Sequence, residues 1–404
     1  MILSFALIIL VGFALSELAF RLRLPRIVGM IFAGILLGPY VLNLIAPEVL
    51  SISIDLRQIA LVIILLRAGL ALDLRDLQKV GRPALLLSFV PATFELVGVL
   101  VLGPLLLGLT LLESAILGTI LAAVSPAVVV PRMLKLIEEG RGTAKGIPQM
   151  IMAGASVDDI YVIVLFTAFV RMAQSGDLSL VAFLELPIAL VLGVAVGALV
   201  GIGAARFFRR FHMRDTTKVL VLLSLALLFV VAETAVSSFL PFSGFLAVLA
   251  MGIALLMKYP VLTDRLVHKY EKIWVFAETL LFVLVGVAVD IRTIPEIGLF
   301  SIALIFGALL FRTVGVLLST AGRKFTGKER LFVVVSYLPK ATVQASIGSI
   351  PLALGISNGN VMLTIAVLAI LVTAPMGAFL MDLTKHRLLE QTPPAITDPE
   401  SNTI

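Results

Sequence analysis

The 404-residue chain contains no cysteine, a single tryptophan and few charged residues. Without cysteine it cannot form a disulfide scaffold, a cysteine-ligated zinc or iron–sulfur site, or a cysteine nucleophile. Charged residues make up 14% of the chain and hydrophobic residues 60%, whereas soluble proteins have roughly 25% charged residues. A soluble fold could not hide this much apolar sequence. We therefore interpret the chain as an all-α polytopic membrane protein, because isolated apolar segments cross a bilayer as helices.

Apolar segments of the length that crosses a bilayer, about 20 residues, follow one another along the chain. We count thirteen of them, near residues 2–20, 26–45, 54–73, 82–108, 112–136, 147–173, 180–206, 217–236, 239–257, 270–290, 297–319, 330–354 and 358–383. The sequence therefore predicts 13 transmembrane helices.

Basic residues alternate between the loops. All but six of the 31 Lys and Arg residues lie in every second loop; the six are Arg57, Arg171, Arg292, Arg67, Arg312 and Lys340. The positive-inside rule then places the N-terminus outside and the C-terminus in the cytoplasm. The net charge of +6 is thus a topology signal, and no nucleic-acid partner is expected.

Segments 1–6 and 8–13 can be superposed with a shift of seven, which predicts two inverted-topology repeats. Segment 5 contains Ala123–Pro131 (AVSPAVVVP), and its counterpart, segment 12, contains Leu338–Gln344 (LPKATVQ) followed by Pro351. Proline breaks a helix, and a broken helix at membrane depth survives where it lines a site. The alternative interpretation is a pair of ordinary proline kinks. We expect crossed, discontinuous helices that form a binding site.

Ionisable residues lie near the middle of several segments, where each is energetically costly. Glu95, Asp158 and Asp159 carry three negative charges, and Arg312 and Lys340 carry two positive charges. If Glu95 pairs with Arg312 as a structural ion pair and Asp158 with Lys340, one carboxylate is left to hold a proton or a metal cation. Two adjacent carboxylates at low dielectric repel each other, which favours protonation of one of them. H⁺ and a small cation would then compete for the same oxygens.

Polar and charged residues around these positions leave further alternatives open. The oxygens of Ser125, Ser156, Thr342 and Gln344 could bind a dehydrated cation or cap the broken helices. Symmetry suggests a pair between Arg67 and Glu278 in the scaffold, and Glu233, near a segment end, is expected to reach the membrane interface.

Competition between two ions at one mobile site is the minimum requirement of cation/proton antiport. An intramembrane aspartyl protease also needs two membrane aspartates, but on separate helices that face each other. A cation channel would need a filter-like loop or a ring of carboxylates. An anion or bile-acid-type symporter shares the crossed helices but has no lone carboxylate to titrate.

The motifs around Leu65–Leu70 (LLRAGL), Ala123–Pro131, Gly154–Ile160 (GASVDDI) and Leu338–Ala345 (LPKATVQA) resemble the monovalent cation/proton antiporter superfamily, and most closely its NHA branch of sodium/proton antiporters. The resemblance covers about residues 1–385. It implies exchange of Na⁺ or Li⁺ for H⁺, with K⁺/H⁺ exchange as the alternative, and no cofactor. It also implies that Asp159 is the principal carrier of cation and proton, with Asp158 beside it and Lys340 nearby.

The resemblance further implies a homodimer in a membrane, here expected to be a bacterial inner membrane, and elevator-like alternating access. A core bundle would move against a dimerisation scaffold. The expected divisions are scaffold helices at 1–79 and 211–292, core helices at 80–173 and 293–385, a linker helix at 174–210 and a short cytoplasmic tail at 386–404.

Overall fold

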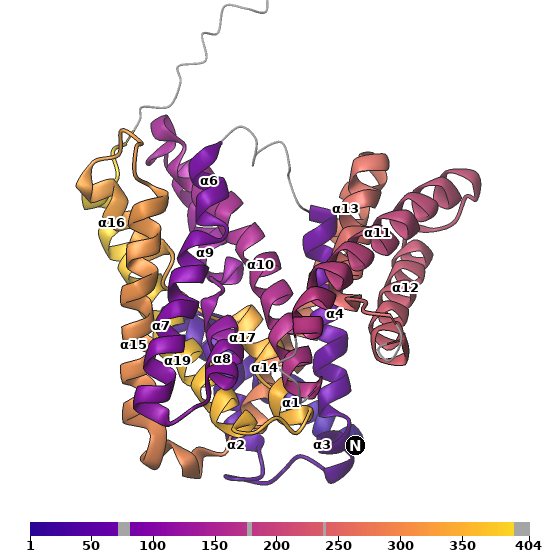
Figure 1. Ribbon diagram of the computed structural model, residues 1–404, viewed down its shortest axis with the longest axis horizontal. Coiled ribbons are helices and arrows are strands. Elements are labelled where there is room, and N and C mark those ends of the chain that lie inside the picture. The colour runs from indigo at the N-terminus through magenta and orange to yellow at the C-terminus, as the bar shows by residue number, and fades with distance from the viewer. Residues whose placement is uncertain (72–80, 176–179, 237–239, 392–404) are drawn as a thin grey trace, which may run out of the picture.

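The computed structural model describes residues 1–71, 81–175, 180–236 and 240–391, and in these ranges the regular elements are helices (Figure 1). In the first half they are α1 (Ile2–Arg21), α2 (Arg26–Leu37), α3 (Pro47–Ser51), α4 (Ser53–Ala71), α6 (Arg82–Leu87), α7 (Val90–Leu107), α8 (Leu111–Ala122), α9 (Pro126–Glu138), η1 (Thr143–Lys145) and α10 (Ile147–Ser175). In the second half they are α11 (Leu180–Arg210), α12 (Asp215–Val236), α13 (Gly244–Lys258), α14 (Pro260–Val287), η2 (Ile291–Thr293), α15 (Ile294–Ser319), α16 (Gly327–Ser336), α17 (Thr342–Ile347), α18 (Ile350–Ala353) and α19 (Gly359–Leu388).

Membrane insertion follows from the length and apolar character of these helices. Within the described ranges, eight helical stretches are long and apolar enough to cross a bilayer. All thirteen expected segments overlap a helix or a set of short helices. The two helices α2 and α13 are apolar but short. The protein is an all-helical integral membrane protein, whereas the count of thirteen crossings and the inverted repeats stay predictions.

Several segments differ from the expected boundaries; α2, for example, ends at Leu37 although its segment was expected to run to residue 45. α14 begins at Pro260, ten residues before the expected segment. Its first turns carry several charged residues, so apolar character alone does not reveal them as part of this helix. The segment at 82–108 is divided into α6 and α7 by a turn at Ser88–Phe89. Pro91 lies in the first turn of α7, where its missing N–H breaks no helical hydrogen bond. Pro91 is therefore a helix-start signal inside the expected segment 82–108.

Both expected helix breaks are present. α8 ends at Ala122 and α9 begins at Pro126, so the chain is extended over three residues. α16 ends at Ser336 and α17 begins at Thr342, after a non-helical stretch that contains Pro339. Pro131 remains inside α9. Proline at the start of a half-helix therefore sets the first break.

Packing divides the helices into two groups. In Figure 1, α4, α11, α12 and α13 lie to the right of α7, α9, α15 and α16, while α1, α2 and α14 overlap the other group in this view. The core group, α6–α10 and α15–α19, is built around close packing of α7 against α15 and of α10 against α6, α8 and α9. The scaffold group, α1, α2, α4 and α12–α14, is built around α4 with α13 and α14 and α1 with α2. The expected linker helix, α11, packs mainly against α13 of this group. The short helix α17 of the core group contacts α4 and α14 of the scaffold group. The broken helix therefore lies against the boundary between the groups.

Glycine allows the closest helix contact in the scaffold group. A Cβ atom at Gly34 in α2 would collide with the backbone carbonyl of Val283 in α14, and one at Gly286 would collide with that of Ile31. Neither backbone can yield without moving a whole helix. Small residues at such contacts are how helices approach each other in membranes.

We expect Gly34→Ala to lower the melting temperature of the purified protein by several degrees, because forced repacking of a tight contact costs about 1–3 kcal/mol. Gly203→Ala on α11 is the matched control, since a Cβ there meets no atom within 4 Å. Alanine is favoured over glycine in a helix by about 1 kcal/mol, so the control should be as stable as the wild type or more so. Equal melting temperatures for both variants would contradict the close α2–α14 contact.

Candidate functional site

The two broken helices cross and touch at their breaks. The backbone N–H of Ser125, at the start of α9, donates to the carbonyl oxygen of Pro339 at 2.9 Å. Ser125 and Lys340 are each at most 1% exposed. The crossing thus brings four half-helix ends to one buried place.

Side chains satisfy the backbone groups that the breaks release. Gln344 Nε2 donates to the carbonyl oxygens of Ile120 at 3.0 Å and Ala123 at 2.9 Å, and Arg312 donates to the carbonyl oxygen of Ala122. At the other end, the N–H of Val124 donates to Asp158 Oδ2 at 2.8 Å. Cationic and amide donors therefore lie at the C-terminal end of α8, and a carboxylate lies at the N-terminal end of α9, as the helix dipoles favour.

Four charged side chains form a cluster of ion pairs beside the crossing. Glu95 Oε2 accepts from Arg312 Nη1 and from Lys340 Nζ, both at 2.6 Å. Arg312 Nη2 donates to Asp158 Oδ2 at 3.0 Å. All four side chains are at most 1% exposed. Two positive and two negative groups within hydrogen-bonding distance offset one another, which buried charges require.

Asp159 lies outside this group. Its Oδ1 is buried and accepts no hydrogen bond from the part of the chain that the structure describes, although the residue as a whole is partly exposed. Four further buried oxygens on elements that meet at the crossing also lack a partner there: Asp158 Oδ1, Ser125 Oγ, Thr342 Oγ1 and Gln344 Oε1. Buried oxygens of this kind call for an explanation, such as an ion or a water. Their oxygen-only chemistry suits a hard monovalent cation.

The structure brings Glu95 and Arg312 together but corrects the other expected pairing. Lys340 binds Glu95 rather than Asp158, and Arg312 bridges the two carboxylates. Depth along a helix is readable from the sequence, whereas the direction in which a side chain points is not. The pairing suggested for Arg67 is also different. Arg67 Nη2 lies 3.6 Å from Glu271 Oε1, and Glu271 precedes the expected partner, Glu278, by about two turns of α14.

Two further residues position the site and were not singled out from the sequence. Thr373 Oγ1 on α19 accepts the backbone N–H of Lys340 at 2.9 Å. The ring of Tyr337 lies 5.4 Å from the Arg312 guanidinium carbon. The sequence signal for Thr373 is a hydroxyl group in the middle of an apolar helix, which indicates a buried hydrogen-bond partner. Gln344 caps the broken helix through its nitrogen, while its oxygen meets no hydrogen-bond donor in the described chain. The side chain of Ser156 lies outside the described residues.

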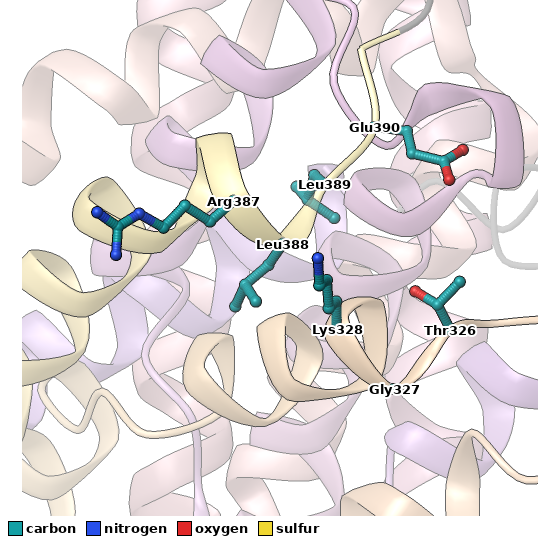
Figure 2. Close-up of a pocket in the computed structure, with 7 residues that line it drawn as sticks. All are labelled: Thr326, Gly327, Lys328, Arg387, Leu388, Leu389 and Glu390. Atoms are coloured by element: carbon teal, nitrogen blue, oxygen red, sulfur yellow. The ribbon is translucent and has the colours of Figure 1, made fainter.

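A separate pocket of about 500 Å³ opens between the start of α16 and the end of α19 (Figure 2). It is lined by Thr326, Gly327, Lys328, Arg387, Leu388, Leu389 and Glu390. None of these residues belongs to the crossing. Among the described residues there is no cluster of three or more His, Asp and Glu side chains placed to hold a metal.

Residues 5–382 match the family of transmembrane sodium/hydrogen exchangers. The chain is 36% identical to human sodium/hydrogen exchanger 9B2 over 91% of its own length and 70% of that protein. It is 33% identical to human sodium/hydrogen exchanger 9B1 over 91% of its length and 73% of that protein. These relatives are animal proteins, so they lend no support to a bacterial inner membrane in particular.

The fold is that of a solved antiporter. The sodium proton antiporter MjNhaP1 from Methanocaldococcus jannaschii, at pH 8, superposes with a TM-score of 0.81 at 20% identity, covering 95% of this chain and 97% of that one. A second structure of the same antiporter gives a TM-score of 0.75, also at 20% identity, over 96% and 98% of the chains. At this identity the likeness concerns the fold alone.

We expect Arg312→Gln to destabilise the protein more than Lys340→Gln. Loss of Arg312 removes the ion-pair partner of Asp158, which keeps only the backbone N–H of Val124, and one of the two partners of Glu95. Breaking a buried ion pair costs about 3–5 kcal/mol. Loss of Lys340 leaves Glu95 bound to Arg312. Thermal melting of the purified variants, with Glu95→Gln added to each for a double-mutant cycle, measures the coupling. Equal losses for the two single variants would contradict the bridging role of Arg312.

Proposed function

The chain belongs to the family of transmembrane sodium/hydrogen exchangers, and we propose that it exchanges Na⁺ or Li⁺ for H⁺ by competition of the two ions at Asp159. The observation that carries the proposal is the charge balance at the crossing. Glu95, Arg312, Lys340 and Asp158 neutralise one another. Asp159, the next residue, forms no ion pair with the described residues, so its negative charge is available to a mobile cation.

The neighbouring oxygens would complete the site. Asp158 keeps Oδ1 free while Oδ2 is held by Arg312 and by the N–H of Val124. Ser125 Oγ and Thr342 Oγ1 are buried and without hydrogen-bond partners in the described chain. Together with Ser156 they are the candidates to replace water around the cation. A proton on Asp159 would remove the charge that holds the cation, which couples the two ions at one site.

Lys340 has a positioning role in this scheme. Its ammonium binds Glu95 and not an aspartate of the ion site, while its backbone N–H is held by Thr373. We therefore assign Lys340 and Arg312 to fixing the crossing in place. Glu95–Arg312 is the structural pair, and Asp158 is connected to it through Arg312.

Alternating access would follow from the division into two groups. The crossing, Asp158 and Asp159 all belong to the core group, and the short helix α17 contacts α4 and α14 of the scaffold group. A rigid displacement of the core group against the scaffold group would carry the ion site from one side of the membrane to the other, which is an elevator-type movement. We propose that the scaffold helices form a homodimer contact within the lipid bilayer, with the C-terminus in the cytoplasm.

The other classes considered from the sequence fit less well. An aspartyl protease needs two aspartates on facing helices, whereas Asp158 and Asp159 are neighbours on α10. The relatives are exchangers, which favours a transporter over an enzyme. K⁺/H⁺ exchange uses the same site chemistry and is therefore an outcome of the transport test.

We expect Asp159→Asn to abolish cation-coupled proton movement, because the amide keeps the shape of the side chain but cannot titrate. The measurement is proton efflux from proteoliposomes on addition of Na⁺, Li⁺ or K⁺ at clamped voltage. Asp158→Asn should weaken exchange strongly but less completely. Asp382→Asn is the matched control. Asp382 lies near the end of α19, is largely exposed and pairs with Arg132 of α9.

Folding of each variant is checked by its elution volume and melting temperature. Wild-type exchange rates in folded Asp159→Asn would contradict the proposed role of Asp159. If K⁺ alone drives proton efflux, the transported cation is K⁺ and not Na⁺, and the proposed ion-binding site stays the same.

A further inference from the structure

Among the described residues, one ion pair joins the two groups of helices. Arg171 lies in the last turns of α10, in the core group, and Glu233 lies in the last turns of α12, in the scaffold group. Arg171 Nη2 is 3.2 Å from Glu233 Oε1 and also donates to the carbonyl oxygen of Phe242. Glu233 was expected to reach the membrane interface, but its side chain is 17% exposed and faces Arg171 instead.

The other ion pairs between described helices stay within one group. Arg132–Asp382, Lys145–Glu329 and the pairs around Glu95 and Asp158 belong to the core group. Arg26–Glu17, Arg67–Glu271 and Arg265–Asp215 belong to the scaffold group. Arg171–Glu233 is thus the ionic contact that relative movement of the groups would break.

The two partners are held unequally. Glu233 Oε2 accepts the backbone N–H of Gly244 at the start of α13, at 2.9 Å, so the carboxylate is fixed within the scaffold group. Arg171 reaches across from the core group and contributes only its own side chain. Separation therefore removes the bonds of Arg171 and leaves Glu233 with its backbone donor. With 26% of Arg171 exposed, water can hydrate the guanidinium after it leaves.

The pair lies on the side of the ion site that is remote from the end of α19. α10 begins beside the end of α19, where Lys145 binds Glu329 at 2.8 Å and the N–H of Gly142 donates to the carbonyl oxygen of Glu390 at 2.9 Å. Arg171 is twelve residues beyond Asp159 on the same helix, or roughly 18 Å at 1.5 Å per residue. In the proposed orientation this is the outer side.

We propose that Arg171 and Glu233 form a latch that closes the outer side of the protein between the core and scaffold groups and opens once in each transport cycle. The proposal rests on the alternating access proposed above. Because α10 carries both Asp159 and Arg171, displacement of the ion site and opening of the latch are movements of one helix. Both residues are positioning residues, since they act on the balance of two conformations and touch no ion.

A bond made in one conformation stabilises that conformation alone, so its removal shifts the balance toward the other. The apparent affinity of an ion depends on the fraction of protein that exposes the site to that ion. Loss of the latch should raise the outward-exposed fraction. Coupling energies of this kind change affinities by about fivefold or more.

The first test uses the full-length protein in proteoliposomes with Arg171→Gln, Glu233→Gln and the double variant. We expect the half-saturating Na⁺ concentration on the outer side to fall roughly fivefold, with a smaller change on the C-terminal side. The double variant should show the same half-saturating Na⁺ concentration as the single variants, because each single substitution already removes the ion pair. Arg132→Gln, which breaks a pair inside the core group, is the matched control. Equal changes on both sides, or none, would overturn the latch.

The second test uses the absence of cysteine from the chain. In Arg171→Cys with Glu233→Cys, a short cleavable thiol crosslinker should stop exchange, and cleavage should restore it. Exchange by the crosslinked protein at the uncrosslinked rate would show that the latch need not open.

Hydrogen–deuterium exchange separates failure of the latch from failure of the proposed function. Amides at the end of α10 and at 240–248 should exchange faster in Arg171→Gln than in the wild type or Arg132→Gln, whatever ion is carried. Unchanged protection would overturn the latch. An unaltered wild type that moves no cation in the liposome assay would instead overturn the proposed function.

Discussion

The Arg312 guanidinium connects the parts of the structure on which the site depends. It binds Glu95 from α7, Asp158 from α10 and the carbonyl oxygen of Ala122 at the end of α8. A helix break in an apolar environment is stable where its freed polar groups find partners, and buried carboxylates require compensation. One arginine on α15 meets both requirements. The break in α8–α9 and the charges beside it therefore stabilise each other. Of the five charged residues near the crossing, Asp159 is the one with no ion pair in the part of the chain that the structure describes.

Much of this arrangement could be predicted from the sequence because it depends on depth in the membrane. Pro126 and Pro339 indicate where helices end, and the positions of Glu95, Asp158, Asp159, Arg312 and Lys340 near segment centres indicate that the charges meet. The charge sum of these five residues already leaves one carboxylate over. Proline and charge are strong signals in an apolar segment, since each needs a compensating partner there.

The remaining features depend on how the helices are rotated and packed, which a single sequence does not determine. Lys340 was assigned to Asp158, whereas the rotation of α7 brings Glu95 to it instead. The pair Arg171–Glu233 was missed because each residue lies near a segment end, where a charged side chain usually reaches water. Thr373 was missed because its role is to accept the backbone N–H of Lys340 from a distant part of the chain.

Competition of Na⁺ and H⁺ for one carboxylate is the central claim, and the pH dependence of Na⁺ binding to the purified wild-type protein tests it most directly. Titration calorimetry in buffers of different ionisation enthalpy gives both the affinity and the number of protons released. The account predicts that the affinity for Na⁺ falls tenfold for each unit of decreasing pH in the acidic range, with about one proton released for each Na⁺ bound. An affinity that does not depend on pH, with no proton release, would contradict it.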